Sequence, residues 1–240
     1  MDEIKLTEGL VNFFLPQHCV ACGRYVPSSL GFPLCSTCLS RVTFLESPFC
    51  VRCGRPLSGG NALLCRRCRR FSFHFDGARA VTIYETPIRE CLHAFKYQGV
   101  LSLVSFFVDL LARYIETNSF LREVHYILPV PLHVRRLRER GFNQSLLLAR
   151  GLSARFQIPL LEGVVTRWRY TTPQVGLSLK ERRKNVREAF RMVRPIPHHK
   201  ARILIIDDVL TSRSTVDALS AVLKKAGCEM VLVLAVASGK

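Results

Sequence analysis

The sequence predicts an α/β protein with a mainly parallel sheet flanked by helices, preceded by a small cysteine-rich module that binds zinc. Three observations support this prediction. Strand-like and helix-like segments alternate from residue 78 to the end, as βαβ units require. Eight of the ten cysteines lie between residues 19 and 68, in four C-x-x-C pairs. The composition, 48% hydrophobic and 22% charged, is typical of a globular protein.

This order of elements divides the chain into three predicted parts. Residues 1–18 carry apolar side chains at helical spacing and are expected to form a short helix docked on the body. Residues 19–76 hold the cysteine pairs and are expected to form a double zinc ribbon. Residues 77–240 are expected to form the α/β domain. The N-terminus is acidic with only a short apolar part, unlike a secretory signal.

The elements of the α/β domain follow from their hydrophobic patterns. Strands are expected at residues 78–85, 124–132, 160–167, 201–210 and 229–238. Helices are expected at residues 87–99, 102–118, 142–157 and 214–227, the last ending at Gly227. A long basic polar segment, 167–190, lies between the third and fourth strands. Ligands of open α/β sheets bind beyond the carboxyl ends of the strands, where Asp207, Asp208 and the turn "PVPL" fall.

The cysteine pairs have the spacing of zinc knuckles. They are Cys19/Cys22, Cys35/Cys38, Cys50/Cys53 and Cys65/Cys68. Each pair presents two thiolates to one ion, and two pairs complete a tetrahedral site, so two structural zinc ions are expected. Disulfides are disfavoured because the protein is expected in the cytoplasm. Sequential pairing of neighbouring knuckles is the default, and an interleaved arrangement stays open.

The charge balance indicates anionic partners. The chain has 35 Lys and Arg against 18 Asp and Glu, a formal net charge of +17. Such a surface favours nucleic acid, phosphorylated ligands or acidic lipid, without choosing among them. The most apolar window, "VLSLVSFFVDLLARYIE", contains Asp109 and is too short to span a bilayer, so no membrane span is expected.

The stretch "RILIIDDVLTSRST", residues 202–215, predicts a site for a phosphorylated sugar. A strand ends in two acids, and a hydroxyl-rich loop then opens a helix. Loop amides and hydroxyls at a helix N-terminus bind phosphate, while paired carboxylates can accept hydrogen bonds from vicinal sugar hydroxyls with Mg²⁺ nearby. Helix capping alone would explain one polar residue but not the whole cluster.

These residues resemble the phosphoribosyl pyrophosphate motif of type I phosphoribosyltransferases. Further blocks narrow the resemblance: "PVPLHVRRLRERGFNQSLLLAR" (129–150), "HAFKYQG" (93–99) and "TPQVGLSLKERRKNVREAF" (172–190). Together with the cysteine knuckles they are similar to the ComF family, competence-associated proteins with a zinc ribbon before a phosphoribosyltransferase-like domain. The resemblance covers nearly the whole chain. It implies a type I phosphoribosyltransferase-like fold and Mg²⁺-dependent binding of phosphoribosyl pyrophosphate.

The resemblance also implies roles for particular residues. Asp207 and Asp208 would hold the ribose hydroxyls, and the segment 167–190 would close over the site. The phosphate loop would comprise Val209, Leu210, Thr211, Ser212, Arg213, Ser214 and Thr215. The pyrophosphate loop and basic rim would comprise Lys96, Pro129, Val130, Pro131, Leu132, His133, Arg135, Arg140, Asn143, Gln144, Arg182, Arg183, Asn185 and Arg187.

Arg213 departs from the family pattern, which usually has glycine at this position. Glycine allows a positive φ and a close approach of the backbone to phosphate. Arginine must either hold an ordinary conformation or accept strain. Its guanidinium could contact the phosphate or occupy the empty phosphate site. We expect ligand binding to survive in modified form.

Three functions remain open from the sequence. The first is an enzyme that transfers the phosphoribosyl group to an acceptor. The second is a factor that handles imported single-stranded DNA, since two basic runs flank the expected site, although aromatic residues for base stacking are sparse there: Phe142, Trp168, Tyr170 and Phe190. The third is a docking module whose zinc ribbons recruit competence or recombination proteins.

Overall fold

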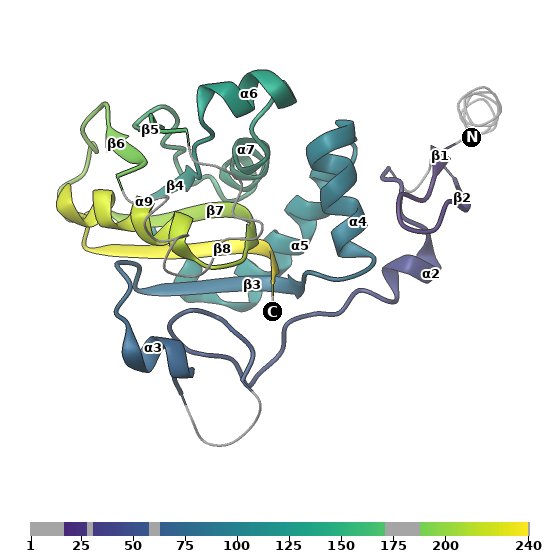
Figure 1. Ribbon diagram of the computed structural model, residues 1–240, viewed down its shortest axis with the longest axis horizontal. Helices are drawn as coiled ribbons and strands as arrows, with labels where there is room; N and C mark the ends of the chain where they lie inside the picture. The colour runs from purple at the N-terminus through teal and green to yellow at the C-terminus, as the bar shows by residue number, and fades with distance from the viewer. Residues whose placement is uncertain (1–16, 28–30, 58–62, 171–187, 240) are drawn as a thin grey trace.

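The computed structural model describes residues 17–27, 31–57, 63–170 and 188–239. Its centre is a four-stranded parallel sheet in the order β3-β8-β7-β4 (Figure 1). The strands are β3 (Gly77–Ile83), β4 (Tyr126–Pro129), β7 (Arg202–Leu210) and β8 (Met230–Ser238). The expected mainly parallel α/β fold with a cysteine-rich N-terminal module is confirmed.

The two central strands carry long apolar runs, residues 203–206 in β7 and 230–236 in β8, because both faces of the sheet are covered. In β7, Leu204 and Ile206 belong to the core on one face, and Ile203 and Ile205 belong to the core on the other. All four side chains are fully buried. A parallel sheet covered on both faces requires such continuous apolar strands rather than an alternating pattern.

Helices cover the two faces unequally. The first face carries α4 (Ile88–His93), the π-helix η2 (Ala94–Gln98), α5 (Leu103–Thr117) and α7 (Gln144–Phe156). The second face carries α9 (Ser214–Lys225). A short 3₁₀ turn, η3 (Ser119–Leu121), follows α5. All four expected helices are present, with the first one changing to a π-helix over its last turn.

Two expectations about the edge of the sheet were wrong in part. Within the expected strand 124–132, β4 ends at Pro129, and a helix that was not expected, α6 (Val134–Arg140), follows the "PVPL" turn. Of the expected strand 160–167, Leu160 makes only an isolated bridge to β4. Gly163 then turns the chain with a φ of 71°, and β5 (Val165–Arg167) pairs with β6 (Phe190–Met192) in a separate antiparallel ribbon.

The cysteine-rich module is split between the two faces of the sheet. Its first half, with β1 (Gln17–His18), β2 (Tyr25–Val26) and α2 (Ser36–Leu39), packs into the core of α4 and α5. Its second half, with α3 (Arg66–Arg70), packs into the core of α9 (Figure 1). The expected N-terminal helix lies almost entirely outside the described residues, and its last two positions form β1.

The polypeptide that joins the two halves runs along β3, the edge strand of the sheet. The Leu45 amide donates to the Val81 carbonyl and the Ile83 amide donates to the Thr43 carbonyl. The module thereby covers a strand edge that would otherwise present unpaired backbone groups. Within the described parts of the chain, no helix has the length and apolar character needed to cross a membrane.

Candidate functional site

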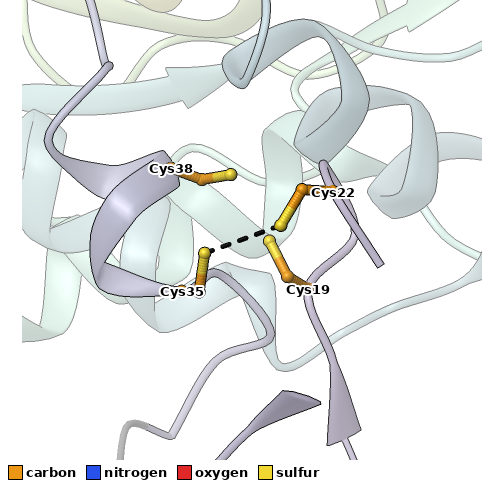
Figure 2. A group of neighbouring side chains, drawn as sticks. All are labelled: Cys19, Cys22, Cys35 and Cys38. Carbon is orange, nitrogen blue, oxygen red and sulfur yellow. Dashed lines mark hydrogen bonds between the residues drawn. The ribbon is translucent and has the colours of Figure 1, made fainter. Parts of the chain in front are cut away.

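Two groups of four cysteines have the geometry of zinc sites. The first is Cys19, Cys22, Cys35 and Cys38, and the second is Cys50, Cys53, Cys65 and Cys68. Within each group all sulfurs lie within 4.8 Å of one another, and in the first they point toward a common centre (Figure 2). The Sγ atoms of Cys22 and Cys35 are 3.7 Å apart, as are those of Cys53 and Cys65. A tetrahedral zinc with bonds of about 2.3 Å requires about 3.8 Å.

The local backbone explains why each knuckle presents thiolates. Gly23 and Gly54 follow the second cysteine of their knuckles with φ of 74° and 64°, and their amides donate to the carbonyls of Cys19 and Cys50. A hydrogen bond from the Arg24 backbone lowers the pKa of Cys22 to about 6, which favours the thiolate that binds metal. Sequential pairing of the knuckles is confirmed, and the two closed four-cysteine sites are structural zinc sites.

The two aspartates lie in β7 and face a cavity of about 380 Å³. Oδ1 of Asp207 accepts hydrogen bonds from the Ser145 hydroxyl (3.1 Å) and the Asp208 amide (2.9 Å). Asp208 forms a largely buried ion pair with Lys96, whose Nζ lies 2.7 Å from Oδ1. Lys96 belongs to the π-helix η2 and reaches Asp208 in β7 from there.

The carboxyl group of Asp207 has a raised pKa. Burial and the neighbouring Asp208 carboxylate raise the pKa of Asp207 to about 7, although Lys96 and two hydrogen bonds act in the opposite direction. The carboxylate of Asp208 is paired with the positive charge of Lys96. The pair thus offers one ion-paired carboxylate and one carboxyl that can gain or lose a proton near neutral pH.

Cations outnumber acids around this cavity. Lys96, Arg136, Arg140 and Arg167 line it together with the two aspartates. Burial, followed by the charge of Arg136, lowers the pKa of Arg167 to about 10, so this guanidinium is poorly solvated and lies near another cation. An anion entering the cavity would relieve that repulsion. The cavity is therefore electrostatically suited to a phosphorylated ligand.

The motif "FNQS" at the start of α7 organises the wall of the cavity. Asn143 caps the helix by accepting the Ser145 amide, and its Nδ2 donates to the Val130 carbonyl in the "PVPL" turn. Gln144 is 1% exposed and its Oε1 accepts from Arg140. Its Nε2 has no hydrogen-bond partner among the described residues. An unpaired buried donor is costly, so a ligand atom or water belongs beside it.

The loop after β7 leads into α9 and surrounds a hollow of about 20 Å³, room for about one water. Ser212 and Ser214 are buried, and the Ser214 amide donates to the Ser212 hydroxyl. Arg213 is also buried and has a φ of 61°, so it adopts the left-handed conformation that glycine adopts more easily. Arg213 lines this hollow, and its guanidinium donates hydrogen bonds to the carbonyls of Leu210, Thr211 and Cys53.

The structure brings together part of the expected site. The expected residues that line the aspartate cavity are Lys96, Val130, Leu132, Arg140, Gln144, Asp207, Asp208, Val209, Thr211 and Thr215. Pro129, Pro131 and Asn143 line a separate, larger cavity of about 440 Å³. His133 and Arg135 instead contact Tyr170. Arg182, Arg183, Asn185 and Arg187 lie outside the described residues.

Sequence reasoning missed several residues of the cavity. Ser145, Arg136, Arg167 and Tyr84 line it but were not expected there. The signal for Arg136 was available, because it lies in the basic run between two expected site segments. Ser145 could have been found from its place directly after Asn143 and Gln144. Arg167 is the first residue of the segment 167–190 that was expected to close over the site, although it was not itself named as a site residue; it ends β5, whose pairing with β6 outside the main sheet was not expected.

Comparison with known proteins identifies relatives for the whole chain. A family model described as a double zinc ribbon domain matches residues 10–69. "Competence protein F" of Haemophilus influenzae is 31% identical over 236 residues, covering 93% of this chain and 97% of the relative. "DNA utilization protein YhgH" of Escherichia coli K12 is 32% identical over 212 residues, covering 87% of this chain and 92% of the relative.

Two further matches are more limited. "Competence protein ComFC" of Bacillus subtilis is 31% identical over 139 residues, covering 53% of this chain and 55% of the relative. Among solved structures, orotate phosphoribosyltransferase from Aeropyrum pernix matches with a TM-score of 0.35 and 20% identity, covering 66% of this chain and 68% of that one.

Proposed function

Since this chain belongs to the ComF family, we propose that its aspartate cavity binds phosphoribosyl pyrophosphate with Mg²⁺ and serves DNA uptake or utilisation. The main support for the proposal is that three features line one cavity. They are the Asp207–Asp208 pair, the loop that opens α9, and the arginines Arg136, Arg140 and Arg167. The link to DNA comes from the names of the relatives.

Each part of the ligand has a chemical counterpart in the cavity. The two carboxylates would accept hydrogen bonds from the ribose hydroxyls and contribute to Mg²⁺ binding, which commonly uses one or two carboxylates together with ligand phosphates. The 5′-phosphate would lie at the mouth of the 211–215 hollow, at the positive end of the α9 dipole. The pyrophosphate would lie among Arg136, Arg140 and Arg167.

The same arrangement supports a transfer reaction. The bond between the anomeric carbon and the pyrophosphate oxygen would break, and pyrophosphate would leave with the bonding electrons. An acceptor nucleophile would then bond to that carbon and lose its proton. The arginines and Mg²⁺ would stabilise the charge that develops on pyrophosphate, the main requirement of such a step. Mg²⁺ would supply charge neutralisation, and the side chains of the cavity would orient the sugar.

Calorimetry with phosphoribosyl pyrophosphate and Mg²⁺ tests the binding proposal. Wild-type protein should release or absorb heat with a saturable isotherm. The double variant Asp207→Asn/Asp208→Asn should bind at least about a hundredfold more weakly, because two hydrogen-bonded, metal-binding carboxylates are lost. Asp109→Asn is the matched control, since Asp109 is an exposed acid on α5 that pairs with Arg155 on α7. Equal binding by the double variant and the control would overturn the proposal.

A second candidate function, binding of single-stranded DNA, is favoured by exposed aromatic rings covered by arginines. Arg140 lies 5.1 Å from the centre of the Tyr97 ring, and Arg135 lies 4.8 Å from that of Tyr170. Trp168 is flanked by Arg169 and Arg191 at 5.3 and 5.8 Å. Tyr97 and Trp168 are 63% and 46% exposed. Rings that bases can stack on, beside cations for the phosphates, characterise sequence-independent single-strand sites.

Trp168→Ala is expected to weaken the binding of a fluorescent oligothymidine by about 1–3 kcal/mol, the typical loss of one base-stacking contact. Charge reversal at Arg135 and Arg136 should also make binding less steeply dependent on salt. Tyr25→Ala is the control, because Tyr25 is half exposed but belongs to the first half of the zinc module. Equal losses for Trp168→Ala and Tyr25→Ala would exclude a local stacking site.

A further inference from the structure

Arg213 connects the loop that opens α9 to the second zinc site. Its guanidinium donates to the Thr211 carbonyl (2.6 Å) and the Leu210 carbonyl (3.2 Å), both beside the loop's own hollow. Nε donates to the Cys53 carbonyl (3.3 Å), inside a zinc knuckle. The remaining nitrogen donates to the Ser238 hydroxyl at the end of β8 (2.7 Å). One side chain thus joins three segments that are distant in sequence.

This connection requires the unusual backbone of Arg213. A non-glycine residue in the left-handed region is strained, and such a conformation persists only where its surroundings impose it. Here the side chain is 3% exposed and all three guanidinium nitrogens donate hydrogen bonds. The anchoring of the side chain therefore holds the loop backbone in a conformation that arginine would not adopt by preference.

The second zinc site forms part of the environment of the guanidinium. Cys53 is a ligand of that site, and the thiolates of Cys53 and Cys65 favour the charged form of Arg213. Burial, and to a smaller extent Arg55, lowers the pKa of Arg213 to about 10. Zinc bound by four thiolates carries net negative charge, so the second site provides both the carbonyl that Arg213 binds and a counter-charge for its cation.

The first zinc site has no comparable connection to the loop among the described residues. It packs on the opposite face of the sheet, in the core that contains α4 and Cys91. The two sites therefore have the same ligand chemistry but different neighbours. The first site can therefore serve as a control for the second. Loss of zinc from either site removes one metal ion, but only the second site contacts Arg213.

We propose that Arg213 is a positioning residue through which zinc at the second site fixes the conformation of the 211–215 loop. Loss of that zinc would release the Cys53 carbonyl, loosen the guanidinium anchor and allow the loop to leave its present conformation. Zinc at the first site would have no such effect. The coupling is reciprocal, so release of the loop would also weaken the second zinc site. If the 211–215 loop binds a phosphate as proposed above, loss of the second zinc would also weaken ligand binding. Only this consequence rests on the proposed function.

Hydrogen exchange of the loop amides, without ligand, tests this coupling. Cys68→Ser and Cys38→Ser are matched variants at equivalent positions of the second and first sites. Native mass spectrometry should count one zinc fewer in each. Loop 211–215 should exchange about tenfold faster or more in Cys68→Ser, the change expected from losing a hydrogen bond to a charged group, and at the wild-type rate in Cys38→Ser. Amides of residues 203–206 in β7 report whether the sheet remains folded.

Arg213→Gly tests the route of the coupling. Its loop should exchange faster than wild type with both zinc ions bound, and adding Cys68→Ser should produce little further increase. Fully additive effects would overturn the proposal, as would equal loop exchange in the Cys68→Ser and Cys38→Ser variants. Arg213→Lys, which keeps the charge but lacks the planar fork, should be intermediate.

A reverse measurement covers the case in which Cys68→Ser does not fold. With all cysteines present, a chelator should remove zinc from the second site about tenfold faster in Arg213→Gly than in wild type, with the first site unchanged. Cysteine alkylation followed by mass mapping assigns each loss to its site. Equal rates in both proteins would overturn the proposal. Both measurements are made without phosphoribosyl pyrophosphate. Their results therefore test the coupling between the second zinc site and the loop independently of the proposed ligand.

Discussion

Gly54→Ala is expected to destabilise the protein by about 3 kcal/mol, whereas Gly23→Ala should cost only about 1 kcal/mol. The two glycines occupy equivalent knuckle positions, after the second cysteine in "CVACG" and "CVRCG", and both have positive φ. A side chain at either position therefore carries backbone strain. Only at Gly54 would the new methyl also overlap the Ala78 carbonyl oxygen on β3, while at Gly23 it would enter open space.

Urea unfolding with zinc counting by native mass spectrometry measures both effects. Gly54→Ala should lower the unfolding midpoint strongly and release zinc from the second site, because the knuckle must move away from β3. The Ala78 amide also donates to the Arg52 carbonyl, so this strand and knuckle are held in direct contact. Equal destabilisation by the two variants would show that backbone strain alone matters and that the close approach to β3 does not.

Asp207→Asn is expected to stabilise the unliganded protein at alkaline pH while abolishing ligand binding. Burial and Asp208 raise the pKa of Asp207 to about 7, so the native state holds this proton more tightly than the unfolded chain does. Between about pH 4 and pH 7 the native state binds more protons, so its stability falls as pH rises and is constant above that window. Asparagine is neutral at every pH and removes this contribution.

The expected gain at pH 8 is about 1–2 kcal/mol, or a few degrees in Tm for a chain of this size. The full pKa shift would correspond to more, but Asp207 is partly exposed and solvent screens the effect. Thermal unfolding of wild type, Asp207→Asn and the Asp109→Asn control at pH 5 and pH 8 measures it. The same pH dependence in wild type and Asp207→Asn would contradict the prediction. A binding site that is unstable without its ligand is common where function requires buried charge.

Much of the fold followed from local sequence patterns. The apolar runs within β7 and β8 could be recognised because the parts of a strand that are buried on both faces are continuously apolar. The helix at residues 214–225 was marked by its apolar stripe and by Gly227. Helix α6 was missed because it is short, has no buried residue and is mostly arginine, so it carries no hydrophobic period.

Local sequence patterns identified the candidate site where neighbours in space are also neighbours in sequence, whereas Lys96, Arg140 and Gln144 were expected there from the family resemblance. Asp207, Asp208 and the loop that follows belong to one strand–loop–helix unit, and its polar residues identified it. Ser145 and Arg167 belong to other elements and come to Asp207 through the packing of α7 on β7 and the departure of β5 from the sheet. Ser145 directly follows two expected site residues in the sequence, but its contact with Asp207 depends on how α7 packs on β7.

By itself, the sequence determined the cysteine spacing, the parallel order of strands and helices, and the placement of two carboxylates before a hydroxyl-rich loop. These are local properties, because knuckles, periodic elements and strand ends are encoded within a few residues. Only the tertiary structure decided what Arg213 does. The sequence placed this arginine in a phosphate loop, but its side chain turns toward the Cys53 carbonyl, 160 residues away along the chain. The physical reason is that the second zinc site packs against the same face of the sheet as α9, so that the Cys53 carbonyl and the Ser238 hydroxyl at the end of β8 both accept hydrogen bonds from the buried guanidinium.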